Sequence, residues 1–218
     1  MSIWLGDFFP NFECDTTEGR LRLHDYWGNG WGMLFSHPAD FTPVCTTELG
    51  ALAALIPEFT KRNVKCIALS CDPVESHKEW IKDIQAYNDI STFDYPIISD
   101  PERDYVIKLG ILDPAEKDRI GLAQTGRAVF IVGPDKCLKA SFLYPGTTGR
   151  NFNEILRVID SLQLAACKKV ATPANWKNGE ECMVLASVSN EDAAMMFPQH
   201  VVKDIPSGKK YIRLTPQP

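Results

Sequence analysis

One of the seven cysteines lies in a loop whose composition favours a reactive thiol over a structural one. Cys45 comes shortly after the run Pro38-Ala39-Asp40-Phe41 and two residues after Pro43. Thr42 and Pro43 predict the start of a helix, with Thr42 as the N-cap and Pro43 at the first helical position. Cys45 then lies in the first turn, where unpaired backbone N–H groups and the positive end of the helix dipole stabilise a thiolate. We therefore expect nucleophilic chemistry at this sulfur.

The segments on either side of this loop predict a strand before it and a helix after it. Residues 31–35 are apolar on both alternating faces, which is typical of a strand buried on both sides of a sheet. Two more apolar runs, 64–70 and 128–132, predict further buried strands with helices between them. Strands that alternate with helices predict an α/β sandwich. The helix after the loop is predicted by apolar residues at helical spacing: Leu49, Leu52, Ala53, Ile56 and Phe59.

Several shorter segments carry turn and capping signals. Short strands are expected near Phe12 and over residues 21–23. Residues 72–75 (Asp-Pro-Val-Glu) predict a capping box that starts a helix with proline at its first position. Residues 110–126 contain three glycines and predict a loop, and residues 133–136 predict a hairpin turn.

The character of the chain changes near residue 165. Residues 171–179 are typical of a linker, and a strand over 183–188, a helix over 191–197 and a final hairpin are expected beyond it. We therefore predict a first domain over residues 1–165 and a small C-terminal α+β extension over residues 166–218. The extension is too small for a large core of its own, so we expect it to pack on the first domain or on a second subunit.

The composition excludes several classes of function. With 218 residues, 44% of them hydrophobic, the chain can bury a core, but its net charge of −5 provides no basic field for nucleic acid or anionic lipid. No apolar run approaches the roughly 20 residues of a membrane-spanning helix, so stable membrane insertion is not expected. An odd number of cysteines without a secretory signal predicts free thiols in a reducing compartment, which we expect to be the cytoplasm.

The run around Cys45 is a specific motif. The spacing Pro38-x-x-x-Thr42-x-x-Cys45 resembles the active-site motif of the peroxiredoxins, and Phe-Thr-Pro-Val-Cys-Thr-Thr-Glu is similar to the one-cysteine, peroxiredoxin-6-type branch. Residues 27–48, 127–136, 148–164 and 209–218 also resemble that branch, so the similarity covers most of the chain. The resemblance implies a thioredoxin-like fold, with a central mixed sheet flanked by helices, and implies neither a cofactor nor a metal.

The resemblance also implies a thiol-dependent peroxidase that acts on hydrogen peroxide and on organic hydroperoxides, lipid hydroperoxides among them. Cys45 would attack one peroxide oxygen, Thr42 would point its hydroxyl into the same space, and Pro38 would shield the thiolate from water. Arg127 would supply the cation that stabilises charge on the leaving oxygen; without the resemblance, an arginine at a strand end is usually a solvated flank. A homodimer and an external thiol reductant are implied, the reductant being glutathione, with or without a glutathione transferase, or thioredoxin.

Three further residues are candidates for supporting roles. His37 lies next to Pro38 and either hydrogen-bonds near the thiolate, holds a metal, or is a turn histidine satisfied by backbone. Glu48 lies one turn after Cys45 and would pair with Arg127 or Arg150, the alternative being an exposed carboxylate at a helix start. A metal site at Cys66, Cys71 and His77 is not expected, because the spacing lacks a Cys-x-x-Cys pair.

Two other function classes remain open from the sequence. A thiol-disulfide oxidoreductase would use the same fold but requires Cys-x-x-Cys, whereas Cys45 is followed by Thr-Thr-Glu. A redox-sensing or chaperone-like binding protein would use the cysteine for regulation. Relatives in this branch also carry a phospholipase-like activity on a Gly-x-Ser-x-Gly-like loop with a nearby His and Asp. His24 and Asp135 remain here, but Gly30 replaces the serine, so we expect no such activity.

The resemblance also bears on how an oxidised Cys45 would be reduced. Two-cysteine relatives carry a resolving thiol in a C-terminal Val-Cys-Pro-Ala segment, where this chain has Ala171-Thr172-Pro173-Ala174. Cys182 is the nearest downstream candidate, and the two glutamates before it are expected to raise its pKa and slow its attack. No cysteine of this chain is therefore expected to resolve oxidised Cys45.

Overall fold

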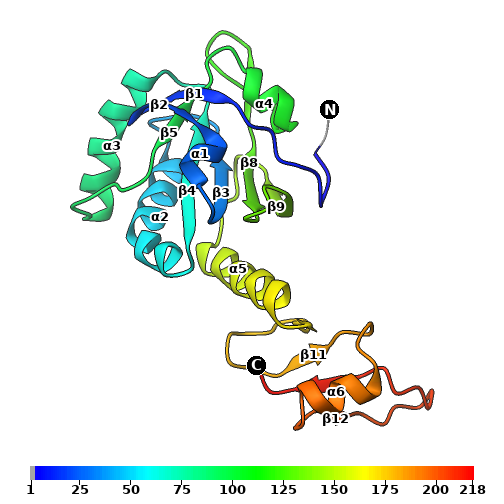
Figure 1. Ribbon diagram of the computed structural model, residues 1–218. Coiled ribbons are helices and arrows are strands. Elements are labelled where there is room, and N and C mark those ends of the chain that lie inside the picture. The colour runs from blue at the N-terminus through cyan, green and yellow to red at the C-terminus, as the bar shows by residue number, and fades with distance from the viewer. Residues whose placement is uncertain (1–2) are drawn as a thin grey trace. The chain divides into compact units, whose positions relative to one another are not determined.

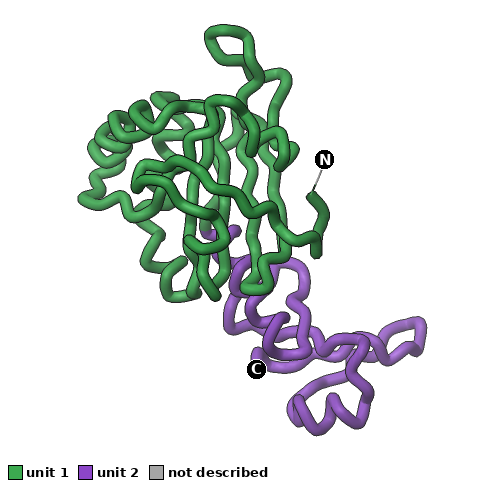
Figure 2. Tube along the Cα trace, turned by 45° about the horizontal axis from the view of Figure 1, so that its top comes forward, with its two compact units in different colours: residues 1–152 green, residues 153–218 purple. Residues whose placement is uncertain are grey.

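The computed structural model describes residues 3–218, and these form two compact units that divide after residue 152 (Figures 1 and 2). The predicted domain boundary at residue 165 lies near the end of helix α5 (Phe152–Cys167) and stays a prediction. Among the described residues, no helix is both long and apolar enough to cross a membrane.

A seven-stranded mixed sheet forms the centre of the first unit. Its strands β3, β4 and β5 are parallel to one another, and all other neighbouring pairs are antiparallel. This arrangement confirms the expected α/β class and mixed sheet. The spatial order is β2 (Gly19–Arg22), β1 (Glu13–Thr16), β5 (Ile97–Ser99), β4 (Val64–Ser70), β3 (Trp31–Ser36), β8 (Arg127–Val132) and β9 (Leu138–Tyr144).

Helices cover the central strands, which are apolar on both faces as the sequence predicts. Helices α2 (Pro43–Lys61) and α3 (Val74–Asn88) contact each other, and they also contact β4 and β5, respectively (Figure 1). Helices α1 (Leu23–Trp27) and α4 (Asp104–Leu109) contribute to an apolar cluster of the first unit. That cluster includes Trp27, Leu34, Ile67, Val106 and Phe130. Helix α1 was not expected from the sequence, which predicted a strand through Leu23.

The two predicted helix starts behave differently from each other. Helix α2 begins at Pro43 as expected, but the Thr42 hydroxyl donates to the carbonyl of Ala39 (2.8 Å) instead of capping the helix. The predicted capping box is wrong, because α3 begins after Pro73 and has no side-chain cap. The Asp72 carboxylate instead accepts hydrogen bonds from the backbone N–H of Asp40 and from the Ser70 hydroxyl.

The expected loop over residues 110–126 contains a β-hairpin, so that prediction is also wrong. Strand β6 (Leu112–Lys117) pairs with β7 (Ala123–Thr125) in antiparallel register. Asp118 stabilises the turn between them, since its carboxylate accepts from the backbone N–H groups of Ile120 and Leu122. This hairpin is held by hydrogen bonds from a polar side chain to the backbone of the turn. Such bonds produce no apolar periodicity in the sequence, so the pattern of residues does not reveal the hairpin.

The second unit contains α5 and a small four-stranded sheet. Trp176 and Cys182 are buried in its apolar cluster. Helix α6 (Asn190–Met196) is capped by Ser189, whose hydroxyl accepts from the backbone N–H of Asp192 (3.0 Å). The expected strand over 183–188 is shorter than predicted. The sheet order is β10 (Val170–Ala171), β11 (Cys182–Val184), β13 (Arg213–Thr215) and β12 (Val201–Val202).

Candidate active site

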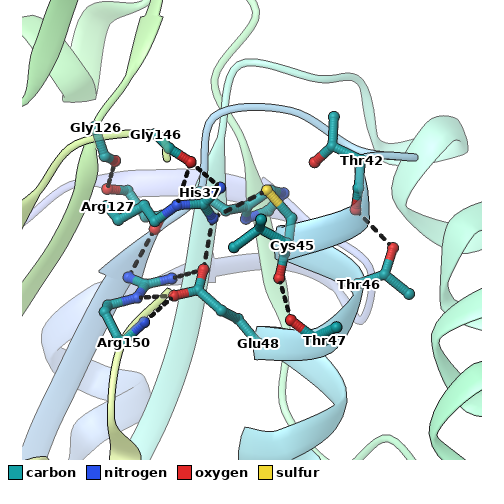
Figure 3. Close-up of polar contacts among 12 residues, drawn as sticks. His37, Thr42, Cys45, Thr46, Thr47, Glu48, Gly126, Arg127, Gly146 and Arg150 are labelled. Carbon is teal, nitrogen blue, oxygen red and sulfur yellow. Dashed lines mark hydrogen bonds and ion pairs between the residues drawn. The ribbon is translucent and has the colours of Figure 1, made fainter. Parts of the chain in front are cut away.

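Cys45 is fully buried in the first turn of α2, and its sulfur accepts a hydrogen bond from Nη1 of Arg127 at 3.2 Å (Figure 3). Antiparallel pairing of β3 with β8 explains this contact, because it places the start of β8 beside the end of β3, where the cysteine loop begins. The Ser36 hydroxyl reinforces the junction by accepting from the backbone N–H of Ala128 and donating to the carbonyl of Gly126. The pairing of strands in the sheet therefore places the guanidinium of Arg127 next to the thiol of Cys45.

Arg127 is held on three sides. Its Nε and Nη2 both donate to the carbonyl oxygen of Gly146, at 3.0 and 2.6 Å. Its Nη1 donates to the carboxylate of Glu48 at 2.6 Å as well as to the Cys45 sulfur. With 3% of its side chain exposed, the guanidinium has little freedom to move, so its charge is fixed beside the sulfur.

Glu48 and Arg150 form the second layer of this charge arrangement. Arg150 donates to both Glu48 oxygens, through Nε, Nη2 and its backbone N–H, at 2.7–2.8 Å. Burial raises the pKa of Glu48, but the hydrogen bonds and charges of Arg150 and Arg127 outweigh it, so the pKa of Glu48 lies below its usual range. Glu48 is thus a buried ion-pair partner and not an exposed carboxylate at a helix start.

The charges of this group are unbalanced without an anion on sulfur. Two guanidinium groups, Arg127 and Arg150, face the single carboxylate of Glu48. Arg150 also donates to the backbone carbonyls of Ser36 and Ala128, so it is anchored to the sheet and cannot turn away. A thiolate on Cys45 would complete the neutralisation, and the arrangement therefore favours the nucleophilic form of the sulfur.

Thr42 and Pro38 border the same loop. The Thr42 hydroxyl lies on the side of the Cys45 sulfur in Figure 3, and because its hydrogen is donated to Ala39, its oxygen is left as an acceptor. The O–H group of a hydroperoxide could donate a hydrogen bond to this oxygen. Pro38 is buried, as expected for a residue that keeps water from the site.

His37 belongs to a buried polar cluster that the sequence did not predict. Its Nε2 lies 2.9 Å from one oxygen of Asp40, and Nδ1 of His77 lies 2.7 Å from the other. Burial raises the pKa of Asp40, but the hydrogen bonds with His37 and His77 hold it well below its usual range. Nδ1 of His37 is buried and has no hydrogen-bond partner among residues 3–218. His37 is therefore satisfied by a carboxylate on one side only, and not by backbone as the alternative reading held.

His37, Asp40 and His77 are also the residues best placed to hold a metal. Within residues 3–218 they form the only group of three or more potential ligands, with ligand atoms within 4.8 Å of one another. Each histidine nitrogen already faces its own carboxylate oxygen at hydrogen-bond distance, so an ion would have to break both contacts. The sequence-based combination of Cys66, Cys71 and His77 is not assembled as a cluster.

The other cysteines differ from Cys45 in their surroundings. All seven thiols are free, and burial raises the pKa of Cys14 and of Cys71 to about 12. Burial also raises the pKa of Cys66. The pKa of Cys182 is raised as expected, but burial causes the shift, not the preceding glutamates. The guanidinium contact found for Cys45 is thus the feature that sets it apart.

Three contributors to the site escaped the sequence reading. The Gly146 carbonyl carries no side-chain signal, and the buried roles of Asp40 and His77 depend on a contact over 37 residues between the loop after β3 and helix α3. A usable signal was present for Asp40, which lies three residues after His37 within the motif itself.

Comparison with known proteins agrees with this geometry. Residues 5–141 match the AhpC/TSA family, and residues 161–200 match the C-terminal domain of 1-Cys peroxiredoxin. Peroxiredoxin-6 of Bos taurus is 63% identical and that of Homo sapiens 61% identical, each over 98% of this chain and 97% of the relative.

Solved structures show the same relationship. The C45S mutant of peroxiredoxin 6 from Arenicola marina has a TM-score of 0.98 at 59% identity, covering 100% of this chain and 99% of that one. A yeast mitochondrial 1-Cys peroxiredoxin has a TM-score of 0.90 at 44% identity, covering 98% and 99%. The chain therefore belongs to the one-cysteine peroxiredoxins of the peroxiredoxin-6 type and is a thiol-dependent peroxidase with a thioredoxin-like fold.

Proposed function

We propose that Cys45 is the peroxidatic nucleophile and that Arg127 is the cation of the reaction. The observation that carries this proposal is the 3.2 Å contact between the Cys45 sulfur and Nη1 of Arg127 in a fully buried turn. A charge-assisted contact in a dry site stabilises a thiolate more strongly than the same contact in water.

The reaction follows from these groups. The Cys45 thiolate attacks one oxygen of the hydroperoxide, a sulfur–oxygen bond forms and the oxygen–oxygen bond breaks. The sulfur is oxidised to a sulfenic acid, and the other oxygen leaves with the bonding electron pair and takes up a proton to become water or an alcohol. Arg127 stabilises the charge that builds on the departing oxygen, because its guanidinium is already oriented before the reaction begins.

The remaining residues of the motif take positioning roles. Thr42 accepts a hydrogen bond from the hydroperoxide and Pro38 excludes water from the thiolate. Glu48 and Arg150 fix the guanidinium of Arg127, which is supported by the three hydrogen bonds of Arg150 to Glu48. His37 supports the loop through its contact with Asp40.

An external thiol completes the cycle in this proposal. The yeast 1-Cys relative is described with a thiol resolving mechanism via glutathione/thioredoxin systems, and we extend that reductant class to this chain, with or without a glutathione transferase. The buried, raised-pKa state of Cys182 supports the absence of an internal resolving thiol. Reaction occurs in the cytoplasm on hydrogen peroxide and organic hydroperoxides, including those of lipids.

A homodimer is part of the same proposal. Strand β9 lies at one edge of the seven-stranded sheet, and its Leu143 side chain is 67% exposed. Residues 6 and 7 bond to Leu138 at the start of this edge, and the remainder, with its exposed apolar side chain, is suited to pairing with a second copy. The C-terminal extension, residues 166–218, is assigned to packing in that dimer.

The test is a comparison of two serine substitutions. Cys45→Ser should abolish steady-state consumption of hydrogen peroxide with dithiothreitol as reductant. Cys66→Ser, at a buried strand thiol without a guanidinium contact, should retain it. Substantial peroxide turnover by Cys45→Ser would refute the assignment of the nucleophile.

A further inference from the structure

A cavity of about 480 Å³ lies against the outer side of the cysteine loop. Residues 39–42 form one wall, which ends at Thr42, three residues before Cys45. The hairpin β6–β7 and its turn form the opposite wall, through Lys117, Arg119 and Gln124. The cavity therefore lies beside the nucleophile without forming part of the contacts that hold it.

Three carboxylates line the cavity, and each already accepts hydrogen bonds from other groups. Asp40 contacts His37 and His77, and Asp72 accepts from a backbone N–H and from a serine hydroxyl. Asp118 accepts from Nη2 of Arg103 at 2.6 Å and from two backbone N–H groups. Within residues 3–218, none of these carboxylates forms an ion pair with Lys117 or Arg119.

Two cations in the cavity have no such compensation. Lys117 and Arg119 are exposed, and within residues 3–218 neither takes part in an ion pair or a side-chain hydrogen bond. Gln124, half-buried on the same wall, adds an amide without a side-chain partner in that part of the chain. The wall that faces the cysteine loop thus offers two positive charges and a hydrogen-bonding amide to a ligand.

We propose that this cavity binds the carboxylates of the reducing thiol, which is a small peptide thiol with two carboxylates, such as glutathione. The inference rests on the proposed function, because it concerns the thiol that reduces the Cys45 sulfenic acid. The first thiol forms a sulfur–sulfur bond with Cys45 and releases water. A second thiol attacks the sulfur of the first, the bond from that sulfur to Cys45 breaks, and Cys45 leaves as a thiolate while the two thiols depart as the symmetrical disulfide.

Anchoring the carboxylates helps this reaction because Cys45 is fully buried. Because Cys45 has no exposed surface, a thiol can touch its sulfur only when neighbouring groups move aside. A reductant held on the facing wall is present at high local concentration at that moment, whereas a free one must arrive by diffusion. With hydrogen peroxide as substrate the charges act on the thiol step alone, since hydrogen peroxide carries no carboxylate.

The test measures each half of the cycle separately by stopped-flow fluorescence. In Lys117→Ala/Arg119→Ala, reduction of the sulfenic form by glutathione should be about 5- to 10-fold slower at low ionic strength, as expected for two exposed charge contacts. Reduction by uncharged dithiothreitol and oxidation by hydrogen peroxide should be unchanged. When glutathione is replaced by its diethyl ester, the rate of reduction of the wild-type protein should fall by a similar factor. The rate of the double variant should fall little further with the ester.

The matched control is Lys108→Glu, which changes the net charge by the same two units at an exposed site on α4. Glutathione should reduce the sulfenic form of Lys108→Glu at the wild-type rate. Equal losses with glutathione and dithiothreitol, an unchanged glutathione rate in the double variant, or an equal loss in Lys108→Glu would overturn the inference. If wild-type Cys45 is not oxidised by peroxide, or dithiothreitol does not reduce it, the proposed function itself fails.

Discussion

Glu48 accepts a 2.6 Å hydrogen bond from Arg127 through the same nitrogen that contacts the Cys45 sulfur. A carboxylate so close to a nucleophilic sulfur would by itself disfavour a thiolate. Arg150 removes that difficulty, because its three hydrogen bonds to Glu48 neutralise the carboxylate and leave the charge of Arg127 for sulfur. Glu48 thereby orients the cation without competing for it.

Replacement of Arg127 by methionine should slow oxidation of Cys45 by about 10²- to 10³-fold, because one preoriented charge contact contributes a few kcal/mol to the barrier. The measurement is the second-order rate constant of the fluorescence change on mixing with hydrogen peroxide. Arg20→Met, at an exposed arginine on β2, is the control and should react as wild type. A near-normal rate in Arg127→Met would remove this residue from the mechanism.

Glu48→Gln should destabilise the fold by about 3–5 kcal/mol, because it leaves Arg127 and Arg150 buried without their shared counter-charge. Urea unfolding at pH 7 measures this loss. Glu13→Gln, at an exposed carboxylate paired with Arg22, should change stability little. A small loss in Glu48→Gln would show that water, and not Glu48, compensates the two guanidinium groups.

The lowered pKa of Glu48 also predicts how stability depends on pH. A carboxyl with a lower pKa in the folded than in the unfolded state, where it is about 4.3, stabilises the fold fully above that value. The contribution is lost as the pH falls through the folded pKa. Unfolding free energies measured from pH 7 to pH 3 should therefore fall more steeply below about pH 4.3 in wild type than in Glu48→Gln. Parallel curves would contradict the buried ion pair.

Oxidised Cys45 should persist as a sulfenic acid when no reductant is present. One equivalent of hydrogen peroxide followed by dimedone should give a single adduct on Cys45 by mass spectrometry, and excess peroxide should produce the sulfinic acid. The burial of Cys182 and the threonine at position 172 both oppose an internal disulfide. Rapid, quantitative linkage of Cys45 to Cys182 or Cys167 would refute the one-cysteine mechanism.

The protein should hydrolyse no phospholipid ester, because Gly30 supplies no hydroxyl for His24 to activate. A serine at position 30 should destabilise the fold. A Cβ atom at Gly30 would lie 2.9 Å from the backbone oxygen of Asn63, which also accepts from the N–H of Trp31. Gly30→Ser should therefore lower the melting temperature. Ester hydrolysis by the wild type, lost in His24→Ala, would contradict this prediction.

The sequence predicts the site better than it predicts the connections. Central strands and α2 follow from apolar periodicity, which is strong where an element is buried. The hairpin β6–β7 and helix α1 are short and partly exposed, so their stabilising contacts come from Asp118 and from the core around Trp27, which no local pattern shows. Around Cys45, the motif identifies the residues to consider, but only the fold shows that Gly146 orients Arg127.

The residues that contact Cys45 and Glu48 lie far from them along the chain, and this separation determines when the contacts can form during synthesis. Arg127 follows Cys45 by 82 residues, and Arg150 follows Glu48 by 102. Contacts of such separation form late in folding, after local helices such as α2. A growing chain therefore presents Cys45 without its cation until residue 150 has left the ribosome and β8 has paired with β3. The contact between Arg127 and Cys45 is in this way a property of the completed first unit.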